Sequence, residues 1–213
     1  MAFQVYDYRT INRNVLVTPE IRARLYHMQP GQVDGRHSHD LGYEVFLILE
    51  GKAEFTIAGH TEVLGPGQMC VALVDEIHQV RNLLPDKPTI MYLSVTPHIQ
   101  PTHTGRSQGE ERDAPRFRAN RGYDDLSAEG LGVDELLESH LEAAEKLAVT
   151  ARSCAITQSE MAERWENAQS KGDRAAAIEA RNAMSDAIYN LHKCLYALDS
   201  AWNALSPLAD GEE

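Results

Sequence analysis

Cysteines are scarce in this sequence and long apolar runs are absent, and both features restrict the kind of protein that it encodes. The 213 residues include three cysteines, Cys70, Cys154 and Cys194, and no Cys-x-x-Cys pair. An odd number without that spacing is typical of reduced thiols in a cytosolic protein. No run approaches the ~20 apolar residues that cross a bilayer, and the first residues lack the basic and apolar stretches of a signal peptide. We therefore expect a cytoplasmic protein.

Basic residues are also few, with 20 Lys and Arg against 32 Asp and Glu, for a net charge of -12. The imbalance lies mainly in residues 121–213, which carry 8 basic and 18 acidic residues, whereas residues 1–120 carry 12 and 14. An acidic chain without a basic stripe repels phosphate backbones and anionic lipid headgroups. We therefore expect no nucleic-acid partner and no membrane partner.

Short apolar runs separated by turn residues occupy the sequence from Val15 to Val95. Examples are residues 45–49 and 53–57, which are separated by Glu50-Gly51-Lys52. Short strands at close, regular spacing predict an antiparallel sandwich or barrel, and no stretch is long enough for the helices of a parallel sheet. We place this domain at residues 1–100. Residues 101–130, rich in proline, glycine and charge, are predicted to form an irregular linker.

From Val133 onward, apolar or small residues recur at alternating steps of four and three, which predicts helices. Gly172-Asp173 interrupts the pattern, with Asp173 placed to cap a second helix, and Pro207 ends it. We predict a two-helix antiparallel hairpin over 131–207, each helix on the order of 50 Å long. The first stripe comprises Leu137, Leu141, Ala144, Ala148, Ala151, Ala155, Gln158, Ala162 and Trp165. The second comprises Met184, Ile188, Leu191, Leu195, Leu198, Trp202 and Leu205.

One partner helix cannot cover a full heptad stripe together with Trp165 and Trp202. Two copies that form a four-helix bundle would cover them, so we favour a homodimer through the helical hairpin. Packing of the hairpin across the back of the barrel is the competing explanation.

A cluster of metal-ligating residue types lies between residues 37 and 78. His37 and His39 are two apart, so in an extended strand both side chains face the same side. Gly42 allows the chain to bend, and Glu44 begins the next apolar strand, while His78 could supply a fourth ligand from a neighbouring strand. Nitrogen and carboxylate ligands together suit a divalent transition metal.

Both stretches resemble the motifs of the cupin superfamily. The first resembles the first cupin motif at every signature position: Gly31, His37, His39, Glu44 and Gly51. The second resembles the second motif in Gly67, His78 and Asn82, but has Leu73 and Asp75 where that motif usually carries Pro and Gly. The resemblance covers about residues 15–96 and does not extend to the helical part.

The resemblance implies an all-β cupin double-stranded β-barrel of the jelly-roll type, here followed by the helical hairpin. It implies one divalent metal ion bound in the barrel mouth by His37, His39, Glu44 and His78, with Fe(II) favoured and Mn, Ni, Co or Zn as alternatives. Many cupins of this ligand set are dioxygenases or oxidases of small oxygenated organic molecules, and we expect such an oxidoreductase. The alternatives are a metal-dependent isomerase, epimerase or lyase, or a non-catalytic small-ligand-binding or sensor protein.

Further site residues are predicted around the metal. Glu44 could also act as a catalytic acid or base, and Arg22, Arg24 and Arg36 could bind a substrate carboxylate. His98 and His103 lie just beyond the last strand, either over the barrel mouth or in a flexible loop. Candidates for the substrate pocket, each also suited to barrel core or structural hydrogen bonding, are Arg24, Tyr26, Met28, Phe46, Ile48, Phe55, Val80 and Asn82.

Overall fold

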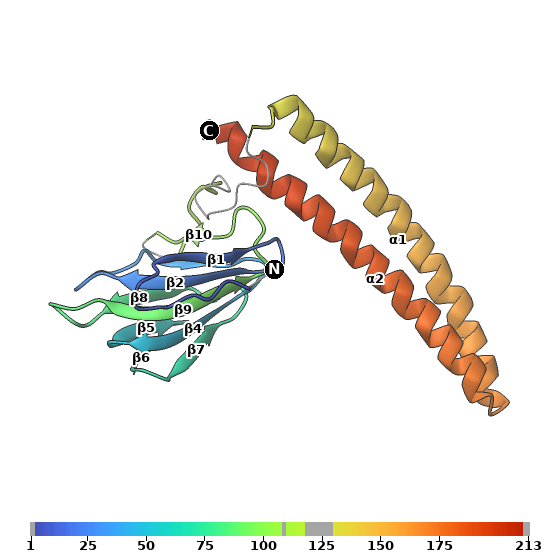
Figure 1. Cartoon of the computed structure of the whole chain (residues 1–213), viewed down its shortest axis with the longest axis horizontal. Coiled ribbons are helices and arrows are strands. Elements are labelled where there is room, and N and C mark those ends of the chain that lie inside the picture. The colour runs from blue at the N-terminus through green and yellow to red at the C-terminus, as the bar shows by residue number, and fades with distance from the viewer. Residues whose placement is uncertain (1–2, 108–109, 118–129, 211–213) are drawn as a thin grey trace. The chain divides into compact units, whose positions relative to one another are not determined.

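The computed structural model describes residues 3–107, 110–117 and 130–210, and the chain divides into two compact units (Figure 1). One unit comprises residues 1–129 and 206–213, and the other comprises residues 130–205. The predicted linker at 101–130 lies partly outside the described residues, at 108–109 and 118–129. Its described part includes a short strand, Thr104–Gly105 (β10), which pairs with the sheet of the first unit.

The first unit consists of two five-stranded antiparallel sheets, as predicted for the jelly-roll barrel. The first sheet has the order β1-β2-β9-β4-β7 and the second has the order β10-β3-β8-β5-β6. The strands of the first are β1 (Arg13–Val17), β2 (Arg22–Met28), β4 (Tyr43–Glu50), β7 (Met69–Ala72) and β9 (Thr89–Thr96). The remaining strands of the second are β3 (His37–Ser38), β5 (Ala53–Ile57), β6 (His60–Leu64) and β8 (His78–Asn82).

The core of this unit lies between the two sheets, because alternate residues of each strand point inward. Phe46 on β4 and Phe55 on β5 come from opposite sheets, and their ring centroids are 5.1 Å apart. The buried cluster comprises Met28, Phe46, Ile48, Ala53, Phe55, Leu64, Ala72, Val80, Met91 and Leu93.

Gly42 permits a close approach between the segment that precedes β4 and the end of β9. A Cβ atom at this position would lie 2.2 Å from the carbonyl oxygen of Thr96, so no other residue fits without moving the backbone. The approach sets the register in which Glu44 pairs with Val95 of β9. Gly42 therefore helps to place Glu44.

The second unit is the predicted antiparallel hairpin of α1 (Val133–Ser170) and α2 (Arg174–Leu205). Gly172 takes a φ of 68° in the turn, a conformation that favours glycine. Asp173 Oδ1 accepts a hydrogen bond from the Ala176 amide at 3.0 Å, which confirms the predicted cap. The 3₁₀ helix Ser206–Asp210 follows Leu205 and contains Pro207.

The seam between the helices is one residue out of phase with the stripe predicted on the first helix. Its positions on α1 are Leu136, His140, Ala143, Leu147, Thr150, Cys154, Thr157 and Met161, all buried or half-buried. Three residues of the predicted stripe, Ala144, Gln158 and Trp165, are half-buried as well. Leu137, Leu141 and Ala148 of the predicted stripe are exposed instead. Cys154 and Cys194 are buried free thiols. None of the helices in the described part of the chain is long and apolar enough to cross a membrane.

Candidate metal centre

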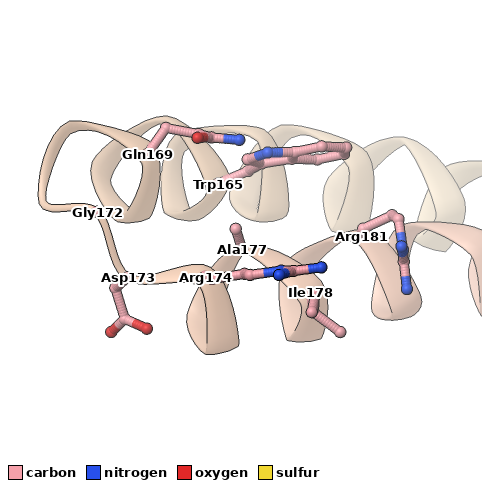
Figure 2. Close-up of a pocket in the computed structure, with 8 residues that line it drawn as sticks. All are labelled: Trp165, Gln169, Gly172, Asp173, Arg174, Ala177, Ile178 and Arg181. Carbon is pink, nitrogen blue, oxygen red and sulfur yellow. The ribbon is translucent and has the colours of Figure 1, made fainter.

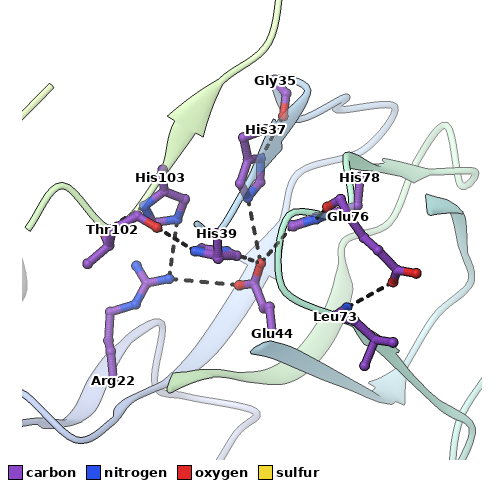
Figure 3. Close-up of polar contacts among 10 residues, drawn as sticks. All are labelled: Arg22, Gly35, His37, His39, Glu44, Leu73, Glu76, His78, Thr102 and His103. Carbon is purple, nitrogen blue, oxygen red and sulfur yellow. Dashed lines mark hydrogen bonds and ion pairs between the residues drawn. The ribbon is translucent and has the colours of Figure 1, made fainter. Parts of the chain in front are cut away.

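The four predicted metal ligands come together between the two sheets (Figure 3). His37 lies on β3 opposite His78 on β8, His39 follows β3, and Glu44 lies near the start of β4. Each offers one ligand atom, and these atoms all lie within 4.8 Å of one another. The four residues that the sequence predicted as ligands thus form a cluster that could hold a metal ion.

One carboxylate oxygen, Glu44 Oε2, lies at the centre of the cluster. It is 2.9 Å from His39 Nε2, 3.0 Å from His78 Nε2 and 3.6 Å from His37 Nε2. Glu44, His39 and His78 are almost fully buried, whereas His37 is half-buried at the open side. The three imidazoles therefore point their Nε2 atoms at one place that is largely shielded from water.

Backbone carbonyls hold the other nitrogen of each imidazole. His37 Nδ1 donates to the Gly35 carbonyl and His78 Nδ1 to the Glu76 carbonyl, each at 2.9 Å. His39 Nδ1 donates to the carbonyl of Thr102, which lies in the segment after β9. A neutral imidazole that donates from Nδ1 keeps a lone pair on Nε2, which is the arrangement of histidines that ligate a metal.

This donor set fits a divalent cation. Lone pairs on Nε2 atoms about 3 Å from a carboxylate oxygen repel it unless a proton or a cation lies between them. His37 Nε2 is buried and has no hydrogen-bond partner among the described residues. Three imidazole nitrogens and one carboxylate oxygen suit a first-row transition metal, and His37, His39, Glu44 and His78 would hold it.

The charges of the cluster perturb its pKa values. Burial alone would raise the pKa of Glu44, but contacts with His37, His39 and His78 outweigh it and hold this pKa well below its usual value. Burial opposes protonation of His37, yet the adjacent Glu44 carboxylate raises its pKa. Glu44 is therefore an anion at neutral pH, ready to bind a cation.

Two residues outside the predicted ligand set complete the centre, Arg22 on β2 and His103. The guanidinium of Arg22 is buried, and its Nη2 lies 3.8 Å from Glu44 Oε1 and 3.5 Å from His103 Nε2. The ring centroid of His103 lies 4.7 Å from that of His39 and 4.9 Å from that of His37. Burial, followed by the charge of Arg22, lowers the pKa of His103 well below its usual value.

His103 therefore lies against the four candidate ligands and not in a flexible loop, which is one of the two alternatives that the sequence left open. His98 is also buried, and burial lowers its pKa to about 3. Arg36 is exposed, and its guanidinium pairs with Glu110 at 3.7 Å.

Most of the predicted pocket residues lie in the packed core of the barrel, where Met28, Phe46, Ile48, Phe55 and Val80 are all buried. The ring centroid of Phe46 lies 5.9 Å from that of His78.

The remaining pocket candidates make polar contacts of their own. The Arg24 guanidinium stacks over the Tyr26 ring at 4.8 Å. The Tyr26 hydroxyl donates to Asp34 at 3.2 Å and accepts from Gln32 at 2.6 Å. Burial, followed by the charge of Asp34, raises the pKa of Tyr26 to about 12.

The side-chain amide of Asn82 is fully engaged with the protein. Its Nδ2 lies within 3.1 Å of three carbonyl oxygens, those of Met28, Gln29 and Lys87. Its Oδ1 accepts from the Leu84 amide and from the Thr89 hydroxyl. These contacts are those of a structural residue that holds a loop to the end of β2.

Comparisons with known proteins relate this unit to one family. The family model described as "Cupin domain" matches residues 24–95. A conserved protein with a double-stranded β-helix domain from Klebsiella pneumoniae is 24% identical over 45% of this chain and 91% of its own, with a TM-score of 0.41. KdgF from Halomonas sp. is 24% identical over 41% of this chain and 77% of its own, with a TM-score of 0.38. No curated protein matches the chain. Residues 24–95 of this chain therefore form a cupin domain.

Proposed function

We propose that this chain is a metal-dependent enzyme that acts on a small oxygenated organic molecule, most simply as a dioxygenase or oxidase with Fe(II). One observation carries the proposal. Three Nε2 atoms and one carboxylate oxygen converge in a buried place, while backbone carbonyls hold the three Nδ1 atoms. When bound, the ion would supply Lewis acidity and, as Fe(II), a centre for dioxygen chemistry.

The residues beside the cluster favour an anionic substrate. Arg22 places a buried guanidinium next to Glu44, and guanidinium groups bind carboxylates or enolates through paired hydrogen bonds. Phe46 and the buried residues below it close the inner side of the cluster and exclude water from it. A substrate would therefore enter past His37, the most exposed of the four ligands.

Metal-dependent isomerisation or lyase chemistry is the second candidate, and His103 is the observation that favours it. Its imidazole lies against His37 and His39 but is not among the four converging ligands. A neutral imidazole in this place could exchange a proton with a substrate bound at the centre. Glu44 is less suited to this role because three imidazoles and Arg22 surround its carboxylate.

We also place the protein in the cytoplasm. Its three cysteines are free thiols, and two of them are buried in the hairpin, which fits a reducing compartment.

The metal site is tested by elemental analysis of protein that has been purified without oxygen. Wild-type protein is expected to carry about one ion of a single transition metal per chain, and His39→Ala is expected to lose it. His60→Ala, at an exposed histidine of β6, is the matched control and should keep the metal. Equal metal content in all three proteins would contradict the proposed site.

The reaction type is tested by oxygen consumption with Fe(II)-loaded protein on a panel of enols, diketones and hydroxy acids. Uptake that depends on substrate would support the dioxygenase. Turnover that persists without oxygen, and that His103→Gln reduces while metal content stays the same, would select the isomerase or lyase. No turnover of either kind would contradict both.

A further inference from the structure

The hairpin of α1 and α2 has two chemically different faces. Successive residues of an α-helix are about 100° apart, so the residues just after the seam positions lie on one side of a helix and those just before lie on the other. Because the two helices are antiparallel, the residues that follow the seam positions of both helices share one face of the hairpin.

The face that follows the seam, here called the apolar face, carries mostly small and apolar side chains on α1 and a mixture of apolar and polar side chains on α2. On α1 it comprises Leu137, Leu141, Ala144, Ala148, Ala151, Ala155, Gln158, Ala162 and Trp165. On α2 it comprises Ile178, Arg181, Ser185, Ile188, His192, Leu195, Asp199 and Trp202. Leu141 is 66% exposed, Ile188 is 45% exposed and Leu195 is 41% exposed. The hairpin by itself therefore leaves these large apolar side chains uncovered.

The opposite face is polar. On α1 it comprises Glu135, Ser139, Glu142, Lys146, Val149, Ser153, Ile156 and Glu160. On α2 it comprises Glu179, Ala183, Asp186, Asn190, Lys193, Ala197 and Ser200. Val149 and Ile156 are exposed there, but charged and hydroxyl side chains separate them. The asymmetry between the faces is typical of a helix pair that has one solvated side and one covered side.

Contacts across the hairpin show which residues of the two helices lie level. The ring centroids of His140 and Trp202 are 5.8 Å apart, and Thr150 Oγ1 lies 3.4 Å from Cys194 Sγ. In this register, Ala148 of α1 lies level with Leu195 of α2. About two turns further along α1, the same register sets Ala155 level with Ile188, and about three turns beyond that it sets Trp165 level with Ile178. At the first two of these three levels, the apolar face thus has an alanine on α1 where α2 has a large side chain.

This pattern is complementary to a second copy of itself. A two-fold axis parallel to the hairpin lays α2 of each copy on α1 of the other at the same level. Leu195 would then lie over Ala148 of the partner subunit, and Ile188 over Ala155 of the partner subunit. Alanines allow the close approach, and the branched side chains fill the groove that they leave.

A pocket at the turn end of the hairpin extends this face (Figure 2). It is lined by Trp165, Gln169, Gly172, Asp173, Arg174, Ala177, Ile178 and Arg181, and has a volume of about 330 Å³. Trp165, Ile178 and Arg181 belong to the apolar face. In the two-fold arrangement, Ile178 of the partner subunit lies level with Trp165 and would fill the pocket.

The face is large enough to hold a dimer. Helices of this length extend about 50 Å, and two helices side by side are about 20 Å wide, which gives roughly 1,000 Å² per chain. Stable interfaces bury about 800 Å² per partner. We infer that the apolar face is the interface between two copies of this chain, which form a four-helix bundle about a two-fold axis parallel to the hairpin.

The test is the molar mass of the full-length chain in solution, measured by light scattering at about 10–100 µM. Wild-type protein is expected to be a dimer. Ile188→Glu and Leu195→Glu are expected to give monomers with unchanged helix content by circular dichroism. The controls Val149→Glu and Ile156→Glu, at exposed positions on the polar face, are expected to remain dimers.

A second variant covers the case in which a glutamate unfolds the hairpin. Ala148 is exposed in the single chain, so Ala148→Trp leaves the fold of one chain intact but collides with Leu195 of the partner subunit. The dimer dissociation constant is expected to rise at least tenfold. A monomeric wild-type protein, or a dimer that tolerates both Leu195→Glu and Ala148→Trp, would overturn the inference.

Discussion

Arg22 Nη2 lies 3.8 Å from Oε1 of Glu44, so this carboxylate faces the histidines with one oxygen and a guanidinium with the other. Both residues pair with Val95 of β9, from its two sides, and therefore lie in one row on the inner face of the sheet. The strand order β2-β9-β4 thus places a buried positive charge beside the candidate metal centre.

Arg22→Gln is expected to weaken the binding of small carboxylates to the metal-loaded protein by roughly tenfold to a hundredfold, because it removes a charged hydrogen bond. The metal content should stay the same, since Arg22 is not a ligand. Calorimetric titration with acetate and oxalate measures the effect. Arg81→Gln, at an exposed position of β8, is the control and should bind as wild type. Equal losses in both variants would argue against a specific role for Arg22.

Gly42→Ala is expected to destabilise the protein by about 3 kcal/mol or more, because its Cβ would collide with the backbone of Thr96. Urea denaturation measures the change. Gly35→Ala is the control, since nothing lies within 4 Å of a Cβ at Gly35. A Gly42→Ala protein as stable as the Gly35→Ala protein would show that the approach between β4 and β9 is looser than described.

Asn82→Ala is expected to lower the free energy of unfolding by about 2–4 kcal/mol, because it leaves several buried polar groups without their partner. Metal content and substrate affinity should remain near those of wild type. Gln79→Ala, which removes a single hydrogen bond to the Asp34 carbonyl, should cost only about 1 kcal/mol. A stable Asn82→Ala protein that no longer binds substrate would instead assign Asn82 to the pocket.

His98 is expected to make the protein sensitive to acid. Its pKa is lowered from 6.5 to about 3 in the folded protein, so between these values the unfolded chain binds a proton that the folded chain does not. The neutral His98 therefore contributes to the free energy of unfolding above pH 6.5. This contribution is lost as the pH falls, and the loss is about 1.4 kcal/mol at pH 5.5.

The measurement is the change in unfolding free energy between pH 7.5 and pH 5.5. His98→Gln should show a smaller change than wild type by about this amount. His60→Gln, at an exposed position, should behave as wild type. An identical pH profile for wild type and His98→Gln would contradict the assignment.

The sequence predicted the four converging side chains because local rules determine them. Period two places His37 and His39 on one side of a strand, and the glycines mark where the chain turns. Arg22 was identified only as one of three arginines that could bind a carboxylate. The position of Arg22 beside Glu44 depends on the order of the strands β2, β9 and β4, which are far apart in the sequence. A single sequence does not give that order.

The position of His103 could not be predicted for a different reason. It lies in a segment without regular alternation, where the path of the backbone depends on tertiary contacts, including the bond from His39 to the Thr102 carbonyl. On the helices, two apolar stripes lie one residue apart in phase. Helical periodicity identified one of them on α1, but the neighbouring stripe, with Leu136 and Leu147, is the one that packs against α2.

The hydrogen bonds from the histidine Nδ1 atoms to backbone carbonyls have a consequence for how this protein can change. The direction in which each imidazole points depends on the course of the main chain, not on the identity of adjoining side chains. Residues around the mouth can therefore be exchanged, one after another, without turning the rings away from their common target. Such a scaffold can change the residues of its mouth while it keeps the same four candidate ligands in place.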